Sequence, residues 1–132
     1  MFAFVKSNTH PAFPIIKTLP SKASTTYKVG DALIMSEGEL VKAGASVKPE
    51  YICACDYVAP AKDMEAIAVY LITPGMEFET TFAADATSVK EGSVVTLHTD
   101  SAQVTATTES GVAKILKKHG TGASGTAVTV TF

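Results

Sequence analysis

The chain has 132 residues and a mass of 13.8 kDa, enough for one ordinary domain with a single buried core. It carries 11 basic and 13 acidic residues, and every basic residue is a lysine. Because arginine is the favoured bidentate partner of phosphates and guanine edges, this near-neutral, arginine-free composition argues against direct recognition of nucleic acid. The apolar fraction of 46% excludes an intrinsically disordered chain.

Neither a membrane span nor a signal peptide is predicted. No run approaches the roughly 20 apolar residues that a membrane helix needs. The apolar start at residues 1–5 is too short for a signal peptide, and its first positive charge, Lys6, follows it instead of preceding it. The only two cysteines, Cys53 and Cys55, suit a reducing compartment, because secreted domains usually carry several disulfide pairs. We therefore expect synthesis in a cytoplasm.

Residues 1–26 are predicted to form an extended N-terminal arm. Prolines 11, 14 and 20 exclude a single helix and push the residues before them towards extended conformations. The apolar side chains of the arm must dock on a surface, either on the chain's own domain or on a partner, and the sequence leaves both alternatives open. The candidates for partner contact are Phe2, Phe4, Phe13, Ile15 and Ile16.

From Tyr27 onward the apolar residues alternate with period two in short segments, and glycine, proline or acidic residues separate these segments. This pattern predicts an all-β domain of short antiparallel strands over residues 27–132. The expected strands are a hairpin of 32–36 and 40–43, then 51–57, 65–72, 76–82, a hairpin of 93–99 and 102–107, and 126–132.

Three further features concern local structure. Pro74 and Gly75 suit the central positions of a type II turn between the strands 65–72 and 76–82. Alternation places Met76, Phe78, Thr80 and Phe82 in the core and Glu77, Glu79 and Thr81 towards solvent, and in the last strand it places Thr129 and Thr131 outward. The only helical material expected is a turn or two at 60–65, at 88–91 and at 112–119.

Residues 29–35 and 91–97 form a weak internal echo. Each places a glycine and a small polar residue just before an apolar strand that leads into an acidic turn. A duplicated strand-turn-strand unit would explain the echo, but the ordinary sequence preferences of β-hairpins would explain it equally well.

Motifs that carry chemistry are weak in this sequence. The run Gly120–Gly125 matches the spacing of a dinucleotide-binding loop, but a strand follows it where that motif requires a helix, so a plain loop is predicted. The two cysteines are expected to pack as free thiols in the core, because the histidines offer no spacing for a metal site. Lys114, Lys117 and Lys118 are expected to form a solvated face. No cofactor and no enzymatic activity are predicted.

The runs 27–43, 49–56 and 66–77 resemble the capsid decoration (cement) proteins of tailed bacteriophages. The shared pattern is a Gly-Asp strand opening, an acidic glycine turn, a strand ending in an acidic residue, a Val-rich strand and a glycine-containing turn. It covers about Tyr27 to Phe132 in element order, whereas the arm over residues 1–26 has no counterpart that can be aligned.

The resemblance implies a small β-barrel or β-tulip-like decoration domain over residues 27–132, with the N-terminal arm contributing to attachment. It implies a structural virion protein on the outer capsid surface that bridges major capsid protein subunits and occurs as a homotrimer, without contact to DNA. The alternative is a receptor- or glycan-binding β module of a phage tail or surface structure. Against this alternative, the chain has no tryptophan and only four tyrosines, mostly in apolar runs.

Overall fold

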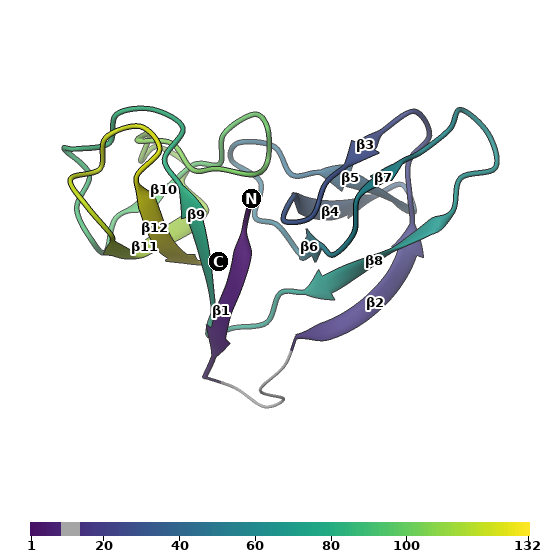
Figure 1. Ribbon diagram of the computed structural model, residues 1–132, viewed down its shortest axis with the longest axis horizontal. Helices are drawn as coiled ribbons and strands as arrows, with labels where there is room; N and C mark the ends of the chain where they lie inside the picture. The colour runs from purple at the N-terminus through teal and green to yellow at the C-terminus, as the bar shows by residue number, and fades with distance from the viewer. Residues whose placement is uncertain (9–13) are drawn as a thin grey trace.

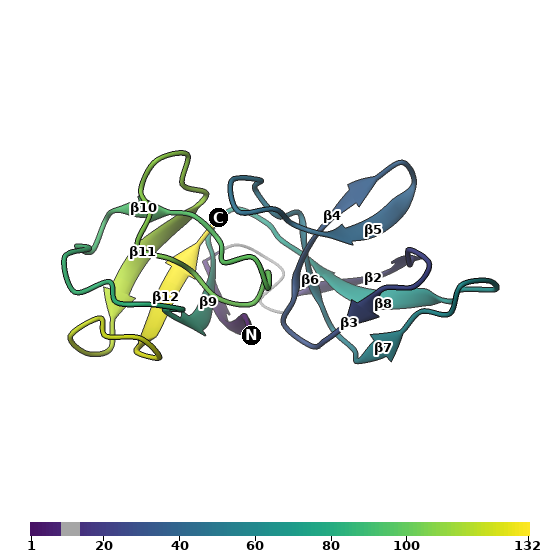
Figure 2. The same cartoon turned by 90° about the horizontal axis from the view of Figure 1, so that it is seen from above.

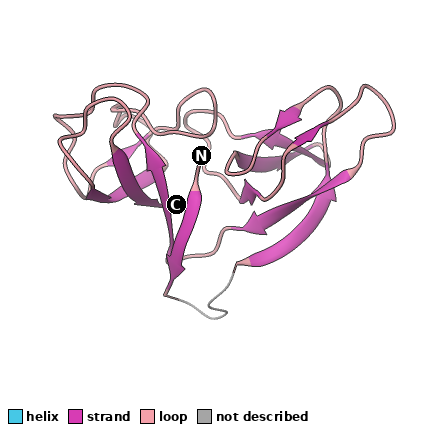
Figure 3. Ribbon diagram, in the orientation of Figure 1, coloured by secondary structure: helices cyan, strands magenta, loops and turns pink. Residues whose placement is uncertain are grey.

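The computed structural model describes residues 1–8 and 14–132, and the described residues form strands, turns and loops without a helix (Figures 1 and 3). The predicted all-β class is therefore confirmed. The strands are β1 (Ala3–Ser7), β2 (Ile15–Pro20), β3 (Thr26–Tyr27), β4 (Ala32–Ser36), β5 (Glu39–Lys42), β6 (Tyr51–Cys53), β7 (Tyr57–Val58), β8 (Ala66–Leu71), β9 (Met76–Thr81), β10 (Val94–Val95), β11 (Ala113–Lys118) and β12 (Ala127–Thr131).

These strands form two separate five-stranded antiparallel sheets and one two-stranded ribbon, β3 with β7. One sheet has the order β2-β8-β6-β4-β5, and the other has the order β1-β9-β12-β11-β10. Figure 2 shows two lobes side by side, which we call the N-terminal lobe (residues 14–72) and the C-terminal lobe (residues 76–132 with β1). Strand pairing closes neither sheet into a barrel in the described part of the chain, so the single barrel expected from the resemblance is replaced by two open sheets.

Each lobe buries its own apolar cluster. In the N-terminal lobe the cluster includes Leu33, Leu40 and Val69, all fully buried. The cluster of the C-terminal lobe is larger and also includes residues of the N-terminal lobe, among them Ile52. Tyr70 of the N-terminal lobe packs against this cluster. Because successive residues of a strand point to opposite faces, the sheet of the N-terminal lobe covers its own core with one face and meets the C-terminal lobe with the other.

The alternation predicted for residues 76–82 is confirmed. Met76, Phe78 and Thr80 are at most 3% exposed, whereas Glu79 on the opposite face is exposed. The turn at Pro74 and Gly75 is also present, since the Met76 amide donates to the carbonyl of Thr73 over 3.2 Å and Gly75 has a φ of 85°. This turn joins the two sheets, because β8 and β9 belong to different lobes.

The three helical turns predicted from the sequence are wrong, and one outward residue is more buried than predicted. Residues 112–119 do not form a helical turn but contain β11, in which Ala113 and Ile115 are fully buried and Lys114 is exposed, a period of two. Thr129 does lie on the outward face, opposite Glu79 and Lys117, but it is covered there: it is only 7% exposed, and its hydroxyl group is hydrogen-bonded to His119 Nε2 at 2.8 Å. The short helical turns expected at 60–65 and 88–91 are bends, turns and irregular loop.

The described part of the N-terminal segment lies on the chain's own sheets. β1 pairs antiparallel with β9 at one edge of the C-terminal sheet, and β2 pairs antiparallel with β8 at one edge of the N-terminal sheet. Of the two alternatives for this segment, docking on its own domain is what the structure shows for these two strands, and they contribute one strand to each lobe (Figure 1).

Candidate interaction surface

Strand β2 is the most exposed long strand of the molecule. It is an edge strand, with β8 as its only strand neighbour in the sheet order of the described residues, and five of its six residues are exposed. Ile15 and Ile16 are 40% and 64% exposed. Large apolar side chains on an open sheet edge are unusual, because such an edge is a ready template for another strand.

The backbone of β2 presents hydrogen-bonding groups to this open side. On β8, the carbonyl of Ala68 accepts a hydrogen bond from the amide of Ala54, beyond β6, and so points away from β2. Thr18 lies opposite Ala68 in the register, so this pair does not share hydrogen bonds. The N–H and C=O groups of Thr18, and of Ile16 two residues earlier, therefore point outward from the sheet.

The five apolar residues predicted to contact a partner lie in different settings. Phe2 is 2% exposed, and its ring meets that of Phe132 edge-on at a centroid distance of 5.4 Å. Phe4 is half-buried, with its ring 6.1 Å from that of Phe78. Phe13 lies outside the described residues. Ile15 and Ile16 alone offer exposed apolar surface, so the candidate surface is centred on β2.

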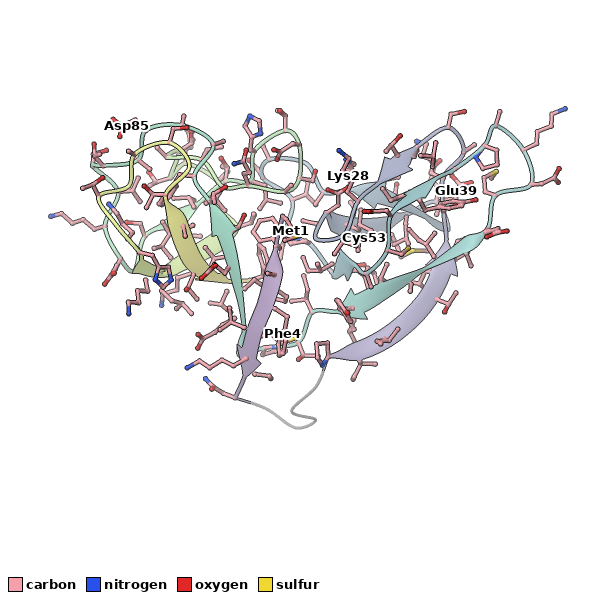
Figure 4. The ribbon with its side chains drawn as sticks, viewed as in Figure 1. Met1, Phe4, Lys28, Glu39, Cys53 and Asp85 are labelled. Carbon is pink, nitrogen blue, oxygen red and sulfur yellow. The ribbon has the colours of Figure 1, made fainter. Side chains whose placement is uncertain are left out.

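A hollow of about 340 Å³ lies at the junction of the two lobes. Figure 4 labels Met1, Phe4 and Cys53 in this region. Apolar side chains from both lobes line it, including Met1, Phe4, Val29 and Tyr70, and Met1 and Val29 are 58% and 43% exposed. Sequence reasoning missed this hollow, because its walls come from strands that are distant along the chain.

The first two residues connect the lobes through hydrogen bonds. The Phe2 amide donates to the carbonyl of Gly30 in the N-terminal lobe over 2.9 Å, and the Met1 amino group donates to the carbonyl of Ala102 in the C-terminal lobe. Burial lowers the pKa of this amino group, and the nearby carboxylates of Asp31 and Asp100 oppose that shift. The N-terminus therefore holds the junction together through its backbone.

Of the two cysteines, Cys53 is fully buried in the core and Cys55 is half-buried. β6 ends at Cys53, so the two residues do not share one regular strand as predicted, and the Cys53 thiol donates to the Cys55 carbonyl over 3.1 Å. Burial raises the pKa of the Cys53 thiol to about 12, which describes an unreactive core thiol. Within the described residues no group of three or more potential metal ligands occurs.

The remaining sequence motifs have structural partners. Residues 120–125 form a loop that leads into β12, as predicted. Lys118, expected in a solvated face, instead donates from Nζ to the carbonyls of Ala86, Thr87 and Val89 over 2.8 to 3.4 Å. Glu77 pairs with Lys6 at 3.3 Å, across β1 and β9.

No protein-family model, curated protein or solved structure matches the chain. The case for a function therefore depends on the sequence runs quoted above and on the surface of the molecule itself. Among the described residues, no helix is long and apolar enough to cross a membrane.

Proposed function

We propose that the chain is a structural protein of a tailed-bacteriophage virion, which binds the outer surface of the capsid and bridges major capsid protein subunits. The sequence runs that resemble decoration proteins correspond to the β4–β5 hairpin, β6, β8 and the start of β9. The observation that carries the proposal is the open edge of β2 with its exposed Ile15 and Ile16. The chain would be made in the bacterial cytoplasm and function on the outside of the head.

Physical arguments favour adhesion through this edge. An exposed edge strand with two isoleucines is an aggregation hazard in a free protein, and a partner that covers it removes the hazard. A capsid lattice offers many identical sites, so a modest contact made by every copy adds up to a strong reinforcement of the shell. The expected homotrimer at three-fold positions is part of the proposal, and sedimentation equilibrium of the purified chain tests it.

A barrel-like shape for each lobe is also proposed. In the N-terminal lobe, Ser21, directly after β2, forms a parallel bridge with Leu40 of β5, so the two edges of that sheet approach each other at one point. In the C-terminal lobe, Phe82 forms the same kind of bridge with Val104. These bridges support a curved, barrel-like shape for each lobe, at a smaller scale than the whole chain.

The alternative, a glycan-binding module, has weaker support. A hollow of about 400 Å³ lies beside Thr26, Asp56 and Tyr57. However, Tyr27 in its wall is 1% exposed and cannot stack on a sugar, and the hydroxyl group of Tyr57 already accepts a hydrogen bond from the amide of Glu65. Saturable binding on a glycan array would favour this alternative over the capsid proposal.

Co-sedimentation with expanded phage heads tests the proposal directly. We expect the intact chain to bind saturably, and the double variant Ile15→Ser with Ile16→Ser to bind at least about tenfold more weakly, because the contact loses two apolar side chains. Val58→Ser is the matched control, since Val58 is 71% exposed but lies on β7, in the two-stranded ribbon and not in the sheet of β2. Equal binding by the double variant and the control would contradict the assignment of the surface, and no binding by the intact chain would contradict the function.

A further inference from the structure

The two lobes are structural repeats of one another. Four backbone hydrogen bonds of the N-terminal lobe recur in the C-terminal lobe with both partners shifted by 62 residues, at similar lengths of 2.8 to 3.1 Å. The preferences of a tight hairpin do not explain this, because three of the four bonds in each lobe join residues that are 17 to 23 positions apart. The donor–acceptor pairs are Gly30–Cys53 and Gly92–Ile115, Asp31–Lys28 and Ser93–Lys90, Cys53–Asp31 and Ile115–Ser93, and Glu50–Leu33 and Val112–Val95.

The strand orders agree with this repeat. β2-β8-β6-β4 in the N-terminal sheet corresponds to β9-β12-β11-β10 in the C-terminal sheet. Lys17 lies opposite Val69 in one lobe, and Phe78 lies opposite Val130 in the other, with both valines fully buried. In this pair of strands the offset between the lobes is 61 residues, one fewer than for the four hydrogen bonds. The weak echo in the sequence therefore lies within a four-strand structural repeat, in which β2 is the counterpart of β9.

The two counterparts differ at their outer edges. β9 is covered by β1, which runs antiparallel to it with Phe4 opposite Phe78 and Lys6 opposite Glu77. No described strand takes the corresponding place beside β2. The chain itself thus shows what this kind of edge accepts, namely an extended antiparallel strand with a large apolar side chain on the core face.

We propose that the open edge of β2 accepts an extended, apolar segment of the major capsid protein, as an antiparallel strand in the position that β1 takes on β9. This inference rests on the proposed function. The outward N–H and C=O groups of Ile16 and Thr18 would pair with the incoming strand. The residue of that strand in the place of Phe4 would lie opposite Lys17 and cover the edge of the N-terminal core.

The chemistry of the edge defines the partner segment further. Glu77, which pairs with Lys6 of β1 in the C-terminal lobe, is replaced at the corresponding position of β2 by Ile16, which is 64% exposed. The incoming strand therefore needs an apolar side chain there instead of a cation. At Pro20 the edge offers no N–H donor, so the added strand pairs mainly with residues 16–18.

Hydrogen exchange on the intact protein, free and bound to expanded heads, provides the first test. In the free protein the amides of Ile16 and Thr18 should exchange rapidly and those of Lys17 and Leu19, which face β8, slowly. On heads, Ile16 and Thr18 should become protected by at least about tenfold, as expected when a backbone hydrogen bond closes. Binding without added protection at these two amides would overturn the proposal but leave the proposed function intact.

Proline substitution provides the second test. Thr18→Pro removes one outward amide and places a ring in the path of the added strand, without removing a hydrogen bond to β8, so we expect at least about tenfold weaker binding to heads. Thr18→Ala keeps the amide and is the matched control, with circular dichroism verifying that both variants fold. Equal binding by the two variants would refute strand addition. Protection of the Ile16 and Thr18 amides from exchange in the free protein at high concentration would also refute it, because the edge would then pair with a second copy of the chain. Failure of the intact chain to bind heads would refute both proposals.

Discussion

Replacing Phe2 by alanine measures how firmly the N-terminal strand belongs to the core. Phe2 is 2% exposed, packs edge-on against Phe132 and donates its amide to Gly30. A buried phenylalanine covers roughly 150 to 250 Å², which at about 25 cal/mol per Å² corresponds to about 4 to 6 kcal/mol. Because core Phe→Ala substitutions cost about 3 to 5 kcal/mol, we expect the free energy of unfolding to fall by about 4 kcal/mol.

Two matched variants grade the effect along the same segment. Phe4 is half-buried against Phe78, so Phe4→Ala should cost about 2 kcal/mol, between the core and surface ranges. Ile16 is 64% exposed, so Ile16→Ala should change the free energy of unfolding by no more than about 0.5 kcal/mol. The expected order of destabilisation is therefore Phe2, Phe4, Ile16.

Equilibrium unfolding in urea, followed by circular dichroism, is the assay. With an m value of about 2 kcal/mol per molar urea, a loss of 4 kcal/mol moves the midpoint down by about 2 M. The reasoning would be refuted if Phe2→Ala and Ile16→Ala had the same midpoint, because the N-terminal segment would then be a free arm in solution. A fall in the m value of Phe2→Ala alone would show that the lobes unfold separately once their junction is weakened.

Two further predictions concern the junction and the core. Gly30 and Gly92 are counterparts in the two lobes, with φ of 85° and 89°. Gly92→Ala should lower the free energy of unfolding by about 1 kcal/mol, for the left-handed conformation alone. Gly30→Ala should lower it by about 3 kcal/mol, because the new Cβ would also lie 2.8 Å from the Phe2 backbone nitrogen. Thermal melts compare the two, and equal losses would contradict the contact at the junction. Burial raises the pKa of Cys53 from 9.0 to about 12, so its contribution to stability is fully present below pH 9 and is lost as the pH rises, by about 1.4 kcal/mol per pH unit. Burial also raises the pKa of Tyr27 above its ordinary value of 10.0, so the variants are compared between pH 8 and about 10. In that range urea unfolding should show this slope in Cys55→Ala but not in Cys53→Ala, and the same slope in both would exclude Cys53 as its source.

Local structure was predictable wherever neighbouring residues determine it. The hairpin of β4 and β5 follows from alternation around an acidic glycine turn, and the structure has Glu37 and Gly38 at φ of 53° and 84°. The wrong prediction of a helical turn at residues 112–119 also came from a local pattern. The dipeptide Ile115 and Leu116 breaks the period of two, and the structure accommodates it with a register irregularity between Ile115 and Lys117.

Long-range pairing was not predictable from the sequence. β1 pairs with β9, more than 60 residues away, and no local pattern in residues 3–7 states which strand they will join. The assignment of Phe2 and Phe4 to partner contact and the hollow at the junction both depended on that pairing. Ile15 and Ile16 were recognisable as contact candidates because prolines on both sides keep their strand at an edge, where side chains can stay exposed.

The structural repeat also accounts for the open edge of β2. The corresponding strands β2 and β9 present equivalent edges in the two lobes, and the additional strand β1 covers only that of β9. β2 instead carries the charged residue Lys17 on its core face, and Pro20, which has no amide hydrogen, at its end. Natural proteins use both devices to prevent an open edge from pairing with other strands. The outward groups of Ile16 and Thr18 stay available between them. Under the proposed function, a contact restricted in this way would be weak in a single copy and would be strengthened by many copies held on one capsid lattice.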